Sequence, residues 1–184
     1  MRLKYNSPVI LTFTILAFTV LITNIILGGL LTPMFFTAYP GFGMFTPFGL
    51  IGSVGHILGH ANWAHYSANF LSILLVGPLL EEKYGSKKML FMIALTAVAT
   101  SFFNAVFFPT GLKGASGIVF MMLILASCTD FKTKQIPITL VLASAIFLGR
   151  EFVGATRPDN ISQFSHIFGG LMGAGFGLFM PPKK

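Results

Sequence analysis

Long apolar stretches separated by short polar or glycine-rich segments dominate the pattern of positions along the chain. A helix needs about 20 mostly apolar residues to cross a bilayer. Six stretches are candidates for such spans, at about 8–31, 63–80, 89–108, 115–128, 137–153 and 161–180. Pro8 suits a first helical turn, where its missing N–H costs no hydrogen bond. The pattern predicts an all-α, polytopic membrane protein, a six-helix bundle forming a single domain over residues 1–184.

Composition supports the membrane interpretation. Hydrophobic residues make up 54% of the chain and charged residues only 9%, whereas a typical soluble domain is about a quarter charged. This excludes a soluble globular enzyme, a disordered chain and a nucleic-acid-binding module, so we expect the lipid bilayer as a partner and no nucleic acid. The single cysteine, Cys128, excludes an internal disulfide framework and a cysteine-rich zinc site.

The basic residues predict the orientation in the membrane. With a cytoplasmic N-terminus, the inner segments hold nine lysines and arginines and the outer segments three. The inner set is Arg2, Lys4, Lys83, Lys87, Lys88, Lys132, Lys134, Lys183 and Lys184, and the outer set is Lys113, Arg150 and Arg157. This bias predicts that both termini are cytoplasmic. The nearly uncharged segment 32–62 is then external, and we expect it in the membrane interface. No transit peptide is evident, so a bacterial or archaeal cytoplasmic membrane is expected.

The fourth stretch is too short to cross the membrane. Its 14 residues would rise about 21 Å as a helix, against a hydrocarbon core of roughly 30 Å. The connection 109–114 before it must then dip below the outer surface. Irregular backbone is tolerated at that depth only where protein buries it or water fills a cavity. We expect a wet pocket open to the outside, with residues 114–117 at its floor.

Four polar side chains are expected at one depth near the outer face. His65 and Asn69 are four residues apart and share a helical face. Asn69 lies roughly 9 Å below the outer end of its span, and His166 roughly 8 Å below the outer end of the sixth. Ser116 begins the short fourth span at a similar depth. Polar side chains inside a bilayer are costly, so each is a functional candidate.

These residue types fit acyl transfer. A serine hydroxyl needs a neighbouring base to take its proton, and His166 can serve Ser116 in that role. A tetrahedral oxyanion needs preorganised donors. The Ser116 backbone N–H at the helix start can donate to it, as can the side chains of His65 and Asn69. With water in the pocket, the predicted reaction is hydrolysis, and no cofactor is needed.

Glycines are expected to support this arrangement. Gly114 and Gly117 let the chain turn sharply and approach its neighbours closely. The run Gly169, Gly173 and Gly177 is typical of a helix-packing face, and Gly170 and Gly173 share one face of the sixth span with the histidine. We interpret them as packing residues that bring the sixth span close to the fourth, so that the histidine reaches the serine.

Four motifs carry a family resemblance. They are Gly114-Ala-Ser-Gly117, His65-Tyr-Ser-Ala-Asn69, Ser165-His166-Ile-Phe-Gly169-Gly170 followed by Gly173, and Glu81-Glu-Lys-Tyr-Gly85-Ser. The H-x-x-x-N, serine and histidine motifs, in this order along the chain and on these spans, make the chain similar to the rhomboid family of intramembrane serine proteases. The resemblance covers about residues 5–180 and implies the basic six-helix, rhomboid-like form. Two departures stand out, since the external loop lacks the Trp-Arg pair of many members and Phe120 replaces a common tyrosine. The phenyl ring can pack against His166 but offers no phenol hydrogen bond.

The resemblance implies a serine endopeptidase that cuts membrane-protein substrates in or near a transmembrane helix. It implies substrates with helix-breaking residues near the outer face and a small residue before the cut. Entry would be lateral, past the second and fifth spans. The rival functions are a catalytically silent relative that binds membrane clients, and a small transporter or channel. Intact Ser116 and His166 argue against the first rival, and the lack of charges at mid-membrane argues against the second.

Several of these polar residues also fit purely structural roles. Ser116 can be a helix N-cap, and Asn69 can be a hydrogen-bonding contact between helices. His56 and His60 have the spacing of a metal pair, but no Glu follows His56 as in the zinc-protease motif. We favour a structural, hydrogen-bonding role for both histidines and predict no metal site. Further polar residues are interpreted as marking the inner membrane edge (Glu81 and Glu82) or as packing contacts (Asn24, Asn104 and Ser144).

Overall fold

The computed structural model describes residues 5–128, 138, 142, 145, 146 and 160–183. Its helices, with η denoting the 3₁₀ type, are α1 (Pro8–Ile26), α2 (Leu31–Phe35), η1 (Gly41–Phe45), α3 (Pro47–Gly55), η2 (His56–Leu58), α4 (Trp63–Tyr84), α5 (Ser86–Phe107), α6 (Ser116–Cys128) and α8 (Asn160–Phe179). The β-structure found over these residues is one isolated bridge between Ala38 and Leu112. The predicted all-helical class is therefore confirmed for the described part of the chain.

Three helices, α1, α4 and α5, are long and apolar enough to cross a membrane, judged by length and composition over the described residues. They correspond to the first three predicted spans, and Pro8 stands in the first turn of α1 as expected. The shorter α6 and α8 lie within one residue of the fourth and sixth predicted stretches. The fifth predicted span, 137–153, falls almost entirely outside the described residues, as does Ser144. The count of six spans stays a prediction.

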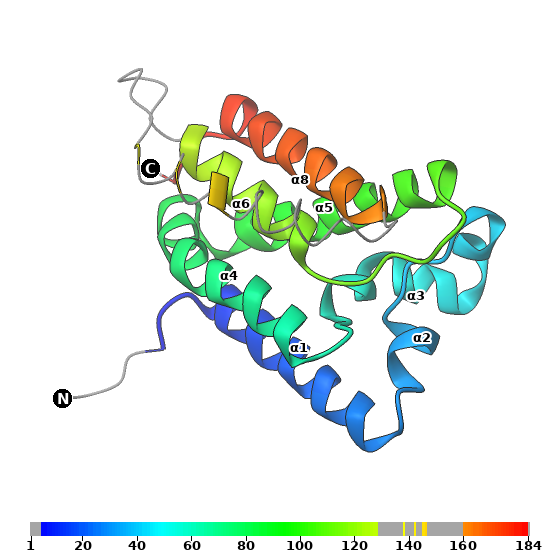
Figure 1. The fold of residues 1–184 in the computed structure, drawn as a ribbon. Coiled ribbons are helices and arrows are strands. Elements are labelled where there is room, and N and C mark those ends of the chain that lie inside the picture. The colour runs from blue at the N-terminus through cyan, green and yellow to red at the C-terminus, as the bar shows by residue number, and fades with distance from the viewer. Residues whose placement is uncertain (1–4, 129–137, 139–141, 143–144, 147–159, 184) are drawn as a thin grey trace.

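The segment between α1 and α4 is more ordered than the expected interfacial loop. It contains α2, η1, α3 and η2, and α2 and α3 lie at the end of the molecule away from the α4–α5 turn (Figure 1). The start of α3 is capped, because the Thr46 side-chain oxygen accepts from Gly49 N at 3.1 Å and Pro47 follows in the first turn. Thr-Pro is a helix-start signal that hydropathy alone does not reveal.

The central helix of the bundle is α6. Ile118, Val119, Phe120 and Met121 point to all sides of it and are all buried. α8 packs beside α6, while α4 and α5 contact its other sides and α1 lies outside against α4 (Figure 1). A helix that is hydrophobic all round belongs in an interior. The short fourth stretch therefore forms the core of the fold.

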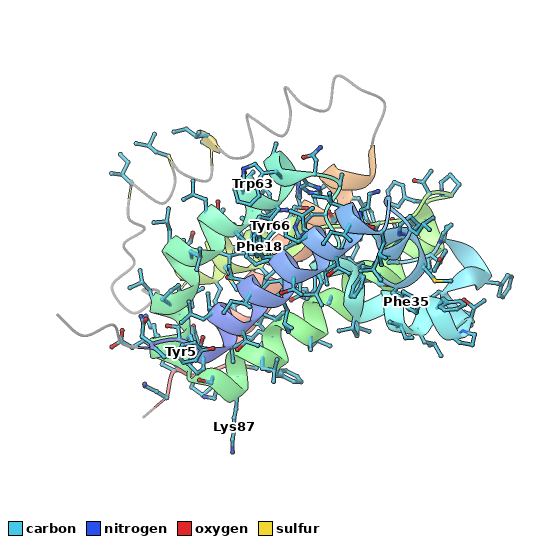
Figure 2. The ribbon with its side chains drawn as sticks, turned by 90° about the horizontal axis from the view of Figure 1, so that it is seen from below. Tyr5, Phe18, Phe35, Trp63, Tyr66 and Lys87 are labelled. Atoms are coloured by element: carbon cyan, nitrogen blue, oxygen red, sulfur yellow. The ribbon has the colours of Figure 1, made fainter. Side chains whose placement is uncertain are left out.

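Aromatic rings join α1 to α4. Figure 2 shows Phe18 of α1 beside Trp63 and Tyr66 of α4. The Phe18 ring centroid is 5.8 Å from that of Tyr66 and 6.2 Å from that of Trp63. Offset and edge-to-face ring pairs at such distances add to the stabilisation from burial alone. They fix α1 on the outside of α4 near the start of that helix.

A buried carboxylate ties the start of α1 to the end of α4. The two Glu81 oxygens accept from Val9 N and Ile10 N, each at 3.0 Å, and Ser86 Oγ donates to Oε1 at 2.7 Å. First-turn N–H groups have no acceptor within their own helix, so Glu81 caps α1 from another helix. Its role is therefore more specific than the membrane-edge marker that the sequence suggests.

The residues after α8 dock at the same end of the bundle. Lys183 N donates to Lys83 O at 3.0 Å, and Lys88 Nζ donates to Pro181 O at 2.6 Å. Together with Glu81, these contacts bring the start of α1, the α4–α5 turn and the end of α8 to one side (Figure 1). Which face of a membrane this end meets stays a prediction.

Replacing Glu81 by Gln is expected to lower the free energy of unfolding by about 1–3 kcal/mol, because a buried N–H loses its acceptor. Thermal unfolding of the protein in detergent measures the change. Glu82→Gln is the matched control, since its side chain is adjacent and exposed. Equal midpoints for the two variants would contradict the capping role of Glu81.

Candidate active site

The connection before α6 is held by backbone hydrogen bonds to the segment between α1 and α4. Ala38 and Leu112 exchange two bonds, with N···O distances of 2.8 and 3.0 Å, and Gly114 N donates to His56 O at 2.9 Å. Leu112 and Gly114 are buried. Protein thus covers the backbone at these two positions, as it must wherever irregular chain lies below the membrane surface, whereas residues 109–111 and 113 are exposed. Entry of water from outside stays a prediction.

Ser116 is the first residue of α6. Ala115 O accepts from Val119 N at 3.0 Å, which makes Ala115 the N-cap residue and Ser116 the first helical residue. The serine is therefore not the N-cap considered from sequence. Its side chain is 9% exposed, and its N–H belongs to the first turn, where the helix dipole is positive.

Gly114 lies directly against the predicted oxyanion residues. Its φ is 116°, a conformation that residues with a Cβ rarely adopt. A Cβ here would lie 2.7 Å from both Cε1 and Nε2 of His65 and 3.8 Å from Asn69 Nδ2. Glycine is therefore required at this position by both conformation and space. The half-buried His65 ring packs on the backbone two residues before Ser116.

The other side of the same segment meets α8. A Cβ on Gly117 would lie 3.3 Å from the Ser165 carbonyl oxygen. One turn further along α6, the Phe120 ring stacks on His166 with centroids 4.4 Å apart and planes inclined by 16°. The ring packing anticipated for Phe120 is thus observed. His166 is buried in this contact, and stacking restricts the tilt of its imidazole.

Glycine also sets the approach of α8 to α6. A Cβ on Gly169 would collide with the Gly117 carbonyl, and one on Gly173 with the Met121 carbonyl. A Cβ on Gly170 would meet only a side-chain atom, Ile124 Cγ1, at an ordinary 3.5 Å. The helices therefore touch through their backbones at Gly169 and Gly173. Gly170, which the sequence assigned the same role, has room for a methyl group.

His60 supports Asn69 from outside the helices. Asn69 Nδ2 lies 3.2 Å from His60 Nε2, and an amide nitrogen can only donate. His60 Nε2 is therefore the acceptor, which leaves the proton on Nδ1, 3.2 Å from the Leu58 carbonyl. The His60 ring also packs edge-on against His65, with centroids 5.0 Å apart. His60 thus holds both predicted oxyanion side chains.

His56 links three segments. Its Nδ1 lies 3.2 Å from Gly52 O, its Nε2 lies 3.4 Å from Thr100 Oγ1 on α5, and its carbonyl accepts from Gly114 N. These contacts agree with the structural role predicted for His56 and His60. Within the described residues, no group of three His, Cys, Asp or Glu side chains is positioned to hold a metal ion.

Burial keeps these two histidines neutral. Desolvation lowers the pKa of His56 to about 4 and that of His60 to about 3. A neutral His60 retains the lone pair on Nε2 that accepts from Asn69. The Asn69 amide is therefore held in one orientation throughout the neutral pH range.

The structure brings the predicted site residues to one segment. Residues 114–120 lie beside His65 and Asn69 on one side and beside Ser165 and His166 on the other. The nucleophile candidate Ser116 thus begins a buried helix, and the candidate base and the candidate oxyanion donors lie on either side of that helix start. The sequence predicted a hydrogen-bonding role for His60 without identifying Asn69 as its partner. It assigned no role to Thr100, a polar residue in an apolar stretch whose hydroxyl lies beside His56.

Two comparisons with known proteins give the family of this chain. A family model described as "Rhomboid domain" matches residues 47–183, a range that includes His65, Ser116 and His166. The chain is also 30% identical over 125 residues to "Rhomboid protease GluP" of Bacillus subtilis (strain 168). That match covers 65% of this chain and 24% of the relative, so the chain spans about a quarter of the relative's length.

Alanine at Gly169 or Gly173 is expected to destabilise the protein by about 1–3 kcal/mol, because the added methyl group meets backbone that cannot move aside cheaply. Thermal unfolding in detergent measures the loss. Gly170→Ala is the matched control on the same helix and should change the midpoint little. If Gly170→Ala proves as damaging as the other two, the backbone contact described above is wrong.

Acid is expected to destabilise the fold through His56 and His60. Their folded pKa values lie below the unfolded value of about 6.5, so the unfolded state binds more protons and stability falls as the pH drops from 6.5 toward 4. Each histidine contributes up to about 1.4 kcal/mol per pH unit. Unfolding midpoints at pH 7 and pH 5 measure this dependence. It should weaken in the double variant His56→Gln, His60→Gln, and an unchanged dependence would refute the assignment.

Proposed function

The chain belongs to the rhomboid family, and we propose that it is a serine endopeptidase that cuts membrane-protein substrates in or beside a transmembrane helix. The observation that supports this best is the position of residues 114–120, between His65 and Asn69 on one side and the Ser165–His166 turn on the other. Membership of the family supports a protease, and the roles given to individual residues below are our proposal.

In the proposed mechanism, His166 takes the hydroxyl proton as Ser116 Oγ attacks the peptide carbonyl. His166 then gives that proton to the leaving amine, and water releases the acyl-enzyme by the same route in reverse. Burial of both side chains favours this chemistry, because electrostatic interactions are stronger where water is scarce. Stacking on Phe120 orients the base without occupying a ring nitrogen.

The oxyanion is assigned to three donors. The Ser116 N–H stands at the positive end of α6, and His65 and Asn69 approach from α4 across Gly114. An oxyanion donor is typically worth about 10²–10³ in rate. Because the Asn69 amide also donates to His60, its second N–H has a defined direction. Preorganisation of this kind avoids reorientation during the reaction.

The membrane arrangement is part of the proposal. We assign six spans, cytoplasmic termini and an active site toward the outer side, in a bacterial or archaeal cytoplasmic membrane. Substrate helices would enter laterally past the second and fifth spans. A helical substrate must unwind first, because its backbone groups are already hydrogen-bonded. Helix-breaking residues near the cut, and a small residue before it, would lower that cost.

A fluorophosphonate probe tests the proposed dyad. The wild-type protein in detergent should be labelled at Ser116. Ser116→Ala should remove labelling, and His166→Ala should slow it by about 10²–10⁴-fold through loss of the base. Ser127→Ala is the matched control, because Ser127 lies on the same helix and its hydroxyl donates to Leu123 O, within that helix, at 2.9 Å.

Two results would overturn the proposal. Folded wild-type protein that resists labelling would have no activated serine, and client binding without cleavage would then become the better function. Labelling that survives in Ser116→Ala would move the nucleophile elsewhere. Folding of each variant is checked by its unfolding midpoint, so that a loss of labelling is not mistaken for a loss of structure.

A further inference from the structure

A groove between α1 and α5 has no part in the proposed mechanism. It encloses about 560 Å³ and lies where Figure 2 shows α1 running beside α5. Phe13 and Leu16 of α1, Leu90 and Ala94 of α5, and Leu58 of η2 are among its walls. Two side chains of its lining, Thr12 and Ser86, are polar. The groove is therefore suited to a hydrocarbon occupant.

A second, polar cavity continues from the first. It encloses about 740 Å³ and shares Pro8 and Ser86 with the groove. Its charged lining comes from Glu81, Glu82 and Lys183. Glu81 is already engaged by the first turn of α1. The available charges are thus one carboxylate and one ammonium group of opposite sign, both on exposed side chains.

We infer that the two cavities form one site for a zwitterionic glycerophospholipid, with an acyl chain between α1 and α5 and a phosphoethanolamine headgroup in the polar cavity. Glu82 pairs with the lipid ammonium group and Lys183 with its phosphate. This amphipathic match is the argument for a lipid. A helix from a partner protein fits the groove less well than an acyl chain. Two turns of a helix about 10 Å wide occupy roughly 850 Å³, which is more than the 560 Å³ of the groove.

Tyr5 marks the expected level of the headgroup. Its hydroxyl lies 3.1 Å from Thr12 Oγ1, and tyrosine rings favour the boundary between hydrocarbon and headgroups. Lys87 lies at the same end of the bundle as Tyr5 (Figure 2). The polar cavity is therefore at headgroup depth and the groove is at acyl-chain depth. This site is independent of the proposed peptidase activity.

Native mass spectrometry of the whole protein in detergent tests the site, with dioleoylphosphatidylethanolamine or dioleoylphosphatidylglycerol added at equal concentration. We expect one phosphatidylethanolamine retained per wild-type protein. Ala94→Phe fills the groove and should weaken retention at least about tenfold, which corresponds to roughly 1.4 kcal/mol. Leu95→Phe, on the same helix but outside the groove, should retain the lipid. Glu82→Gln combined with Lys183→Gln should abolish the headgroup preference.

The outcomes separate the possibilities. Equal retention by Ala94→Phe and the wild type would mean only annular lipid and would overturn the site. Equal retention of the two lipids by the wild type would overturn the headgroup assignment. A wild-type dimer that Ala94→Phe dissociates would assign the groove to a second copy of the chain instead. Because Glu82 and Lys183 are exposed, their variants test the site even if Ala94→Phe folds poorly.

Discussion

The close approach of α8 to α6 is the contact on which the rest of the structure depends. Gly169 and Gly173 let the two helices meet through their backbones, and a single methyl group at either position would push them apart. His166 lies one turn before Gly170 on α8, so its position against Phe120 follows from that approach. Helices in lipid gain little from the hydrophobic effect between themselves, and small residues that permit close packing replace it.

Satisfying buried backbone groups explains much of the remaining architecture. Irregular chain beside a bilayer must find partners within the protein. The Asn24 side-chain oxygen Oδ1 accepts from Thr32 N at 2.8 Å, and Asn104 Nδ2 donates to Thr110 O at 3.0 Å. Both asparagines are thus the structural polar residues that the sequence predicted, with the added detail that each secures a turn. The segment 32–62 also satisfies buried backbone groups, because it supplies the hydrogen-bond partners of the connection before α6.

Polar and apolar features are separated within the bundle. The histidines and Asn69 gather around the start of α6, whereas the groove between α1 and α5 is almost free of polar side chains. In the proposed enzyme, the first region carries the chemistry and the second meets lipid. Glu81 lies near the second region and caps α1 from α4. A lipid bound beside α1 would therefore contact the same helix that Glu81 caps.

The sequence by itself determined the helical class, the positions of five described helices and the residue types of the site. It did so because apolar length, the four-residue spacing of His65 and Asn69, and the residue types at Ser116 and His166 can all be read locally from the chain. The sequence left open which other residues hold these helices and side chains in place. The pairing of Asn69 with His60, the cap that Glu81 places on α1 and the difference between Gly170 and Gly173 depend on contacts between segments far apart in the chain. Only the tertiary structure decides such contacts, since they follow from how the helices pack and not from what each helix contains.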